Sequence, residues 1–177
     1  CSIFHGSVDD FADSHSTFDV AIGLHLCGLL TDSVLELTTR RGALACIVPC
    51  CYGQLAGVEN HDRGGGTAPR QWPRSTAYRA ALGPEGMLDF EAVVKSADAV
   101  AVGHGGAFDA DSPGFAVARR CMACVDADRL LWAREERGYS GRLAALAPLS
   151  CSPKNSVLLL EPPARRREAA TDGGGAV

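Results

Sequence analysis

Residues 18–53 read FDVAIGLHLCG, LLTDSVLELTTRRG and ALACIVPCCYG, and this stretch decides the fold. The first and third segments are short apolar runs rich in Val, Ile and Ala, which is typical of strands buried on both faces. The middle segment predicts a helix, since Thr31 or Asp32 can cap its start and Gly42 suits the position just after its end. A strand, a helix and a strand of this length predict a βαβ unit with two parallel, adjacent strands.

Each of these two strands ends in polar and sulfur-containing residues. The first ends in HLCG (residues 25–28) and the second in PCCYG (residues 49–53). The carboxyl ends of parallel strands lie at one edge of a sheet, where open α/β sheets bind ligands, so we expect both motifs to line one crevice. The candidate site residues here are His25, Cys27, Cys50, Cys51 and Tyr52.

The amino-acid composition limits which classes of protein this chain can belong to. The 177 residues suffice for one domain with a buried core, and 46% hydrophobic and 21% charged residues are ordinary for a globular protein. The net charge of −4 gives no overall field toward nucleic acid or membrane. No segment reads as a membrane span or signal peptide, so we expect no membrane partner. Eight cysteines in this setting favour reduced thiols and a cytoplasmic location.

The amino-terminal residues allow two interpretations. Residues 1–6 (CSIFHG) read as the end of a strand, and Asp9 and Asp10 follow it. The favoured interpretation is a helix start, because Ser and Asp cap helices. In the other, these carboxylates contact a nucleoside cofactor at the carboxyl end of the strand. Because the chain begins at Cys1 inside a strand-like run, we expect it to be part of a longer protein.

Residues 1–161 form one predicted domain with two loop insertions. Gly and Pro break the pattern at residues 54–74 and 103–114, which predicts loops there. Residues 162–177 lack periodicity and predict a disordered tail. Helices are predicted over residues 75–82, 87–99 and 115–138.

The end of the domain predicts an antiparallel hairpin. A strand over residues 139–148 follows the long helix and should run parallel to the first two strands. The turn SCSPKN (residues 150–155) then lies at the same edge as PCCYG, which adds Asn155 to the candidate site. A last strand over residues 156–161 should insert between its partner and the strand before PCCYG. The sequence thus predicts a mostly parallel sheet with an antiparallel carboxyl-terminal hairpin.

The cysteines could act as metal ligands or as nucleophiles. HLCG and PCCYG offer ligands that zinc accepts, but adjacent cysteines rarely reach one tetrahedral ion together, and the zinc deaminase pattern is not matched. Cys121 and Cys124 have CxxC spacing on the apolar side of a predicted helix, which favours core packing. We therefore predict no metal site. A nucleophilic Cys50 with His25 as its base is the alternative to a role for both in shaping the pocket floor, which is favoured.

Several motifs together resemble one known family. HLCG followed by TD, then PCCYG, CMxCVDxDR, EExGYS and SCSPKN resemble the methyltransferase-like domain of the glutathione S-transferase C-terminal domain-containing proteins. The HLCG and CC elements are also similar to Rossmann-like methyltransferases that include a tRNA 2′-O-methyltransferase family. The resemblance runs from about Ile3 to Glu161, with residues 54–114 divergent.

The resemblance implies an N-terminally truncated, Rossmann-like class I methyltransferase fold. Residues 1–6 would match its third strand, the βαβ unit its fourth and fifth strands, and the hairpin its sixth and seventh. The Gly-rich loop and the ribose-binding acid of that fold would precede Cys1. We therefore expect this chain alone to bind S-adenosyl-L-methionine poorly.

The function implied is methyl transfer from S-adenosylmethionine to RNA, with catalysis mainly by positioning. Tyr52 would offer a base its aromatic face and Asn155 would read the polar edge of that base. The alternative is an interaction domain that kept the fold and lost the cofactor. The residues expected to line the methyl-transfer crevice are His25, Cys27, Cys50, Cys51, Tyr52 and Asn155. Those expected to contact the cofactor are Gly6, Asp9, Asp10 and His25.

Overall fold

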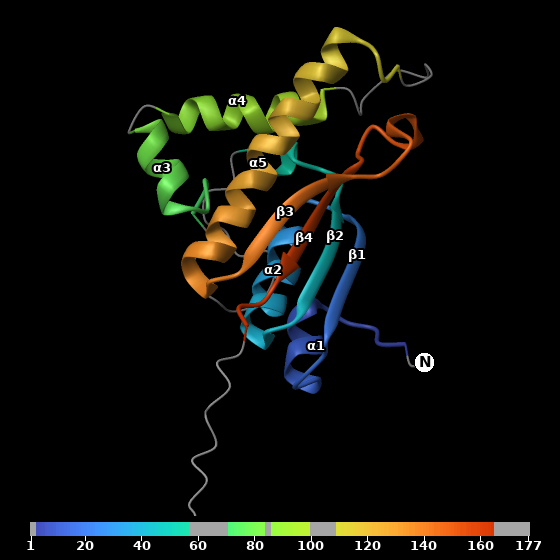
Figure 1. The fold of residues 1–177 in the computed structure, drawn as a ribbon, viewed down its shortest axis with the longest axis vertical. Coiled ribbons are helices and arrows are strands. Elements are labelled where there is room, and N and C mark those ends of the chain that lie inside the picture. Colours follow the sequence, from blue (N-terminus) through green and yellow to red (C-terminus); the bar gives the residue numbers. More distant parts are fainter. Residues whose placement is uncertain (1–2, 57–70, 84–85, 100–108, 165–177) are drawn as a thin grey trace, which may run out of the picture.

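The computed structural model of this chain describes residues 3–56, 71–83, 86–99 and 109–164, and it shows an α/β fold (Figure 1). Its four-stranded sheet has the order β1-β2-β4-β3. The strands are β1 (Val20–Leu26), β2 (Leu44–Pro49), β3 (Ser140–Ala145) and β4 (Ser156–Glu161). β1 and β2 are parallel, as predicted, and β4 is antiparallel to both β2 and β3.

The sheet is mixed, which corrects the prediction of a mostly parallel one. The turn between β3 and β4 is too short for a crossover, so β4 must run back antiparallel to β3. It inserts between β2 and β3, as predicted, and two of the three neighbouring pairs are consequently antiparallel.

The predicted strand at the amino terminus is wrong for the residues described there. Residues 3–6 lie outside the sheet, and Ile3 is 84% exposed. Among the described residues no strand lies beside the outer edge of β1, so this segment has nothing to pair with. Phe4 packs instead on Phe11, with their ring centroids 5.5 Å apart.

The helices begin and end close to their predicted bounds. Ser112 accepts a hydrogen bond from the Phe115 amide at the start of the longest helix, and Gly138 ends it with φ 68°. One predicted cap is wrong, because the helix after β1 begins with Gly28 as its cap and without a capping side chain. The helices are α1 (Val8–Ser14), α2 (Leu29–Arg41), α3 (Thr76–Leu82), α4 (Gly86–Asp98) and α5 (Pro113–Arg137). Two short 3₁₀ turns are η1 (Gly53–Leu55) and η2 (Leu149–Cys151).

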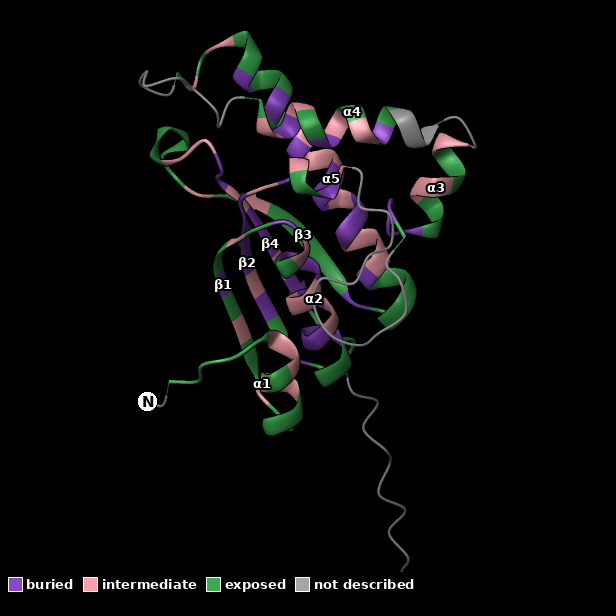
Figure 2. Ribbon diagram, turned by 180° about the vertical axis from the view of Figure 1, so that it is seen from behind, coloured by how far each residue is buried: buried purple, intermediate pink, exposed green. Residues whose placement is uncertain are grey.

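α2 and α5 pack on the same face of the sheet (Figure 2). The described residues leave the other face of β1 open, where Ile22 is 81% exposed and Leu24 is 65% exposed. β1, which was predicted to be buried on both faces, is therefore buried on one face here, whereas β2 has buried residues on both faces, Ile47 on one and Val48 on the other. None of the described helices combines the length and apolarity needed to cross a membrane.

Among the described residues the core consists of two hydrophobic clusters, and α5 contributes to both. The sheet cluster lies between the sheet and the two helices on it, and the helical cluster lies beyond it around α4 and α5 (Figure 2). The sheet cluster comprises Leu35, Ala45, Ile47, Ala133, Tyr139, Leu158 and Leu160. The helical cluster comprises Tyr52, Leu55, Trp72, Phe90, Val94, Ala97, Phe115, Met122 and Val125.

The predicted loop insertions are described in part. Residues 71–74 end the first one, and here Trp72, Pro73 and Arg74 are buried against the core. Residues 57–70, half of the second insertion (residues 103–108) and the predicted tail from residue 165 lie outside the described residues. The end of the first insertion is thus part of the folded domain.

Candidate functional site at the carboxyl edge of the sheet

β1 ends in an irregularity that exposes His25. Leu24 pairs with Val48 and Leu26 with Pro49, so His25 is left unpaired as a bulge. Among the described non-glycine residues only His25 has a positive φ, of 59°. Histidine tolerates this left-handed conformation better than most residues, and bulges often re-aim a side chain next to a functional site. The imidazole is therefore exposed at the carboxyl edge.

Three thiols meet beside this bulge. The Cys51 Sγ lies 3.4 Å from the Cys27 Sγ and 3.4 Å from the Cys50 Sγ. The Gly28 amide donates to the Cys51 carbonyl over 3.0 Å, which holds the end of β1 against the loop after β2. We call Cys27, Cys50 and Cys51 the thiol cluster. Burial raises the pKa of Cys50 and of Cys51, so both thiols stay protonated, and this argues against an activated nucleophile.

A buried lysine joins the turn after β3 to the loop after β2. Lys154 Nζ donates to Asp98 Oδ1 over 2.5 Å and to the Ala97 carbonyl over 2.7 Å. Asp98 in turn accepts from the Tyr52 amide at 3.1 Å and from the Gly53 amide at 2.6 Å. Burial alone would raise the pKa of Asp98, but these hydrogen bonds outweigh it and hold the pKa below its usual value. The SCSPKN turn therefore lies at the same edge as Tyr52, as expected.

Tyr52 and Asn155 face the interior at this edge. Tyr52 is fully buried, and its hydroxyl donates to Asp126 Oδ2 over 2.8 Å. Burial, with the nearby Asp126 charge, raises the pKa of Tyr52 well above its usual value, so the hydroxyl remains a donor. The Asn155 side-chain amide donates to the Leu149 carbonyl over 3.0 Å. In this arrangement neither side chain is open to a substrate base, and both hold the edge in shape.

The three amino-terminal cofactor candidates lie elsewhere. α1 sits beside the start of β1 and the end of α2 (Figure 1), where Arg41 donates to the Ala12 carbonyl over 2.8 Å. The Asp10 carboxylate accepts from the Ser7 hydroxyl at 2.7 Å and from the Ser7 amide at 2.8 Å in a capping box, and these hydrogen bonds lower its pKa. A largely apolar cavity of about 310 Å³ separates Gly6 from β1. Gly6, Asp9 and Asp10 are thus at the opposite edge from His25, and the structure does not bring them together.

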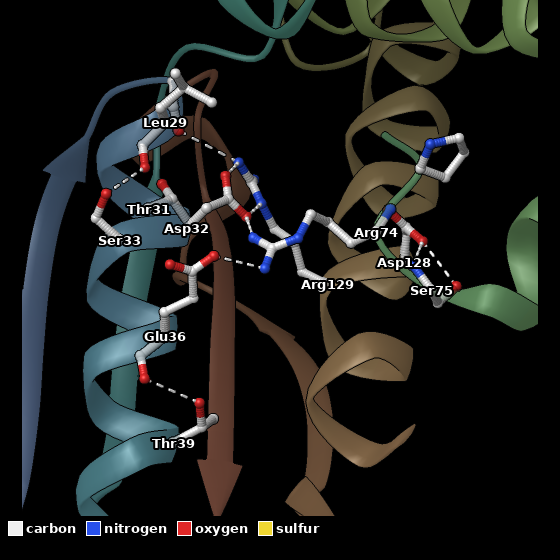
Figure 3. A network of polar contacts seen from close by, with 12 residues as sticks. Leu29, Thr31, Asp32, Ser33, Glu36, Thr39, Arg74, Ser75, Asp128 and Arg129 are labelled. Carbon is white, nitrogen blue, oxygen red and sulfur yellow. Dashed lines mark hydrogen bonds and ion pairs between the residues drawn. The ribbon is translucent and has the colours of Figure 1, made fainter. Parts of the chain in front are cut away.

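A buried polar network that the sequence motifs did not predict lies beneath the site (Figure 3). Arg129 on α5 donates to both carboxylate oxygens of Asp32, at 3.2 and 3.0 Å, and to Asp126 at 3.1 Å. It also donates to the Gly28 carbonyl over 3.4 Å. Burial raises the pKa of Asp126, although the Arg129 charge opposes the rise. These contacts fix the start of α2 and, through Gly28, the HLCG end of β1.

The same network anchors the end of the first insertion. Arg74 donates to Asp32 at 3.2 Å and to Glu36 at 2.7 Å, and its guanidinium lies 4.1 Å from the centroid of the Trp132 ring. Asp128 accepts from the Arg74 amide at 2.6 Å and from the Ser75 amide and hydroxyl at 2.8 and 2.7 Å. One sequence pattern could have indicated this network. The VDxDR motif (residues 125–129) places charged residues on the apolar side of a predicted helix, and buried charges need partners.

Comparisons with known proteins point to one family. Residues 2–58 match the model of a family described as a methyltransferase domain. The glutathione S-transferase C-terminal domain-containing protein of Xenopus laevis is 31% identical over 147 residues, 82% of this chain and 21% of that protein. Its Homo sapiens counterpart is 32% identical over 145 residues, 80% of this chain and 19% of that protein. The Drosophila melanogaster homolog is 31% identical over 159 residues, 90% of this chain and 24% of that protein.

The chain spans about a fifth of the length of these curated relatives. No solved structure matches it. The matched methyltransferase-domain region includes β1, α2, β2 and both strand ends that carry the thiol cluster.

Proposed function

Because the chain belongs to the family of glutathione S-transferase C-terminal domain-containing proteins and carries their methyltransferase-like domain, we propose that it forms one side of an S-adenosylmethionine-dependent methyl-transfer crevice. The observation that carries this proposal is the convergence at one sheet edge. HLCG, PCCYG and SCSPKN come from distant parts of the sequence, and the Lys154–Asp98 contact and the Gly28–Cys51 hydrogen bond hold them together. Functional groups of α/β folds gather at this edge.

The residues at this edge fit the proposed cofactor in part. His25 and Cys27 are exposed beside each other at the bulge and can contact a bound cofactor or substrate. Asp9 and Asp10 do not fit the same site, because α1 lies at the other edge of the sheet. The proposal therefore assigns contact with the cofactor to the carboxyl edge, with His25 as its principal side chain. S-adenosylmethionine would supply the methyl group there.

Each candidate residue has a distinct role in this proposal. The His25 imidazole orients the methyl acceptor or accepts its proton. Lys154 and Asp98 fix the PCCYG loop, and Tyr52 and Asn155 are positioning residues because both are buried. Catalysis would come mainly from holding the reactants in line. RNA is the proposed acceptor, since HLCG and the CC pair resemble a tRNA 2′-O-methyltransferase family.

The test is methyl transfer by the complete protein. Radiolabelled S-adenosylmethionine and total RNA are incubated with the native protein and with the variants His25→Gln and His15→Gln. We expect label in RNA, a loss of about 100-fold for His25→Gln, the scale of general acid–base catalysis, and no loss for His15→Gln, the same change beside α1. Absence of transfer to RNA, or full activity of His25→Gln, would refute the proposal.

A non-catalytic interaction domain is the second candidate. It is favoured by the burial of Tyr52 and Asn155 and by the protonated thiols of Cys50 and Cys51, which leave fewer reactive groups than expected. Calorimetric titration of the complete protein with S-adenosylmethionine separates the two. Binding supports the enzyme, and absence of binding supports the interaction domain.

A further inference from the structure

The thiol cluster has a feature that the proposed methyl transfer does not use. Its three Sγ atoms lie within 4.8 Å of one another, although they come from two segments of the chain. Within the described part of the chain this is the only group of three or more His, Cys, Asp or Glu side chains arranged so closely. Exposure falls from Cys27, which is exposed, through Cys51 to the buried Cys50.

We propose that Cys27, Cys50 and Cys51 together bind one thiophilic closed-shell cation, Zn²⁺ or Cu⁺, through three thiolates. Both ions favour sulfur ligands. With Zn–S bonds of about 2.3 Å, sulfurs around a tetrahedral ion are about 3.8 Å apart. Two sulfur pairs here lie at 3.4 Å, so the ligands need to separate by only a few tenths of an ångström.

Cys50 and Cys51 are adjacent in the sequence, but the backbone between them brings both thiols within reach of one ion. Their Sγ atoms lie 3.4 Å apart, so the two side chains point to the same side of the loop. Packing of free cysteines as small apolar groups accounts for Cys50, which is buried, but not for Cys27, which lies at the surface. Coordination of one ion by all three residues would explain why the Cys27 thiol lies against the other two.

The surroundings define how such an ion is held. The exposed side of the cluster, next to Cys27, leaves a coordination position for a water or a ligand atom, as in zinc sites with three protein ligands. Each thiol that becomes a thiolate ligand releases one proton, so binding should weaken as the pH falls.

The ion would also stabilise the site. It would link the end of β1 to the loop after β2, which the Gly28–Cys51 backbone hydrogen bond and the contacts between the thiols bring together. Because a ligand that binds only the native state raises its stability, bound metal should raise the thermal midpoint.

The experiment uses the full chain, purified with reductant, stripped by a chelator and given one equivalent of Zn²⁺ or Cu⁺. After gel filtration, metal content is measured by mass spectrometry and the thermal midpoint by circular dichroism. We expect one ion per chain, a raised midpoint and proton release. Cys27→Ser, at the exposed ligand, should weaken retention at least tenfold. Competition between the two cations identifies the preferred one.

Two controls separate this site from other thiols. Cys151→Ser removes an exposed thiol near the same edge, and Cys124→Ser removes one of the CxxC pair on α5; both should keep the ion. If Cys27→Ser does not fold, the cadmium NMR shift of the native chain reports the number of thiolate ligands, and three are expected. No retained ion, fewer than three thiolates, or retention lost only in Cys124→Ser would overturn the proposal.

Discussion

Arg129 donates hydrogen bonds to three residues, although its side chain is buried and the residue is only 1% exposed. Burial by itself would lower the pKa of its guanidinium, but the charges of Asp32 and Asp126 raise it above the usual arginine value. It therefore remains charged, and its planar fork can meet both carboxylates and the Gly28 carbonyl at once. Removing a buried charge leaves its partners desolvated and unpaired, which costs more than the pair itself contributes.

Arg129→Met should therefore lower the free energy of unfolding by about 3–5 kcal/mol, because Asp32 and Asp126 would lose a buried partner. Arg120→Met, an exposed position on the same helix, should change it by at most about 0.5 kcal/mol. Urea denaturation followed by circular dichroism measures both. Equal effects of the two substitutions would contradict the structural role given to Arg129.

At the scale of single residues, the sequence predicted which side chains lie at the candidate site better than it predicted which residues they contact. The strand-end motifs predicted that His25 and the cysteines share an edge, since parallel pairing alone determines it. The partners of Asp32 could not be predicted, because Arg74 and Arg129 are separated from it by 42 and 97 positions along the chain. Such contacts depend on how α2 and α5 pack, which periodicity does not specify.

The end of β1 is the element whose shape matters most for the proposed site. A non-glycine residue held at φ 59° costs about 1–3 kcal/mol relative to a relaxed backbone, and glycine adopts this conformation without that cost. A strained residue beside a candidate site is consistent with a functional requirement for its side chain.

His25→Gly should leave stability unchanged or raise it by about 1 kcal/mol, while methyl transfer by the complete protein falls. Leu24→Gly, one residue earlier in the regular part of β1, should lower stability by about 0.5–1 kcal/mol. Thermal unfolding and the radiolabel assay provide the two measurements. A loss of stability in His25→Gly equal to that in Leu24→Gly would show that the bulge is not strained.

Helices were predicted correctly because their sequence signals are local. Segments whose structure depends on contacts with distant parts of the chain were not predicted correctly. α2, α3, α4 and α5 follow from apolar periodicity and from residues such as Gly138 that end a helix. The buried end of the first insertion was not predicted, because Arg74 is buried through contacts with α2 and α5, and Trp72 stacks on Phe90 of α4. Residues 3–6 have strand-like composition but no partner strand among the described residues.

The whole molecule depends on the connection between its two hydrophobic clusters. The strand ladders stabilise the sheet cluster, whereas the helical cluster consists of helices and the buried end of the first insertion. The Arg129 network lies where the two meet, since it joins α5 to α2 and its guanidinium lies 5.6 Å from the Trp72 ring centroid. Within the described residues the Trp72 indole nitrogen has no hydrogen-bond partner, so packing and the nearby guanidinium groups of Arg74 and Arg129 hold this side chain.

The chain has two tryptophans, one for each cluster, which makes the connection testable. Trp72 is part of the helical cluster and Trp132 packs against the sheet cluster. With Trp132→Phe or Trp72→Phe as background, fluorescence follows one cluster at a time during urea unfolding. We expect coincident midpoints in these two single-tryptophan chains, as for one cooperative unit.

Adding Arg129→Met to each background should separate the two midpoints. Trp72 should report the earlier transition, because it loses the Arg129 contact and has no strand ladder to support it, while β2, β3 and β4 keep Trp132 in a packed environment. Arg120→Met in the same backgrounds should leave the midpoints coincident. If they coincide in Arg129→Met as well, the clusters are coupled by packing along α5 itself and not by the buried charges.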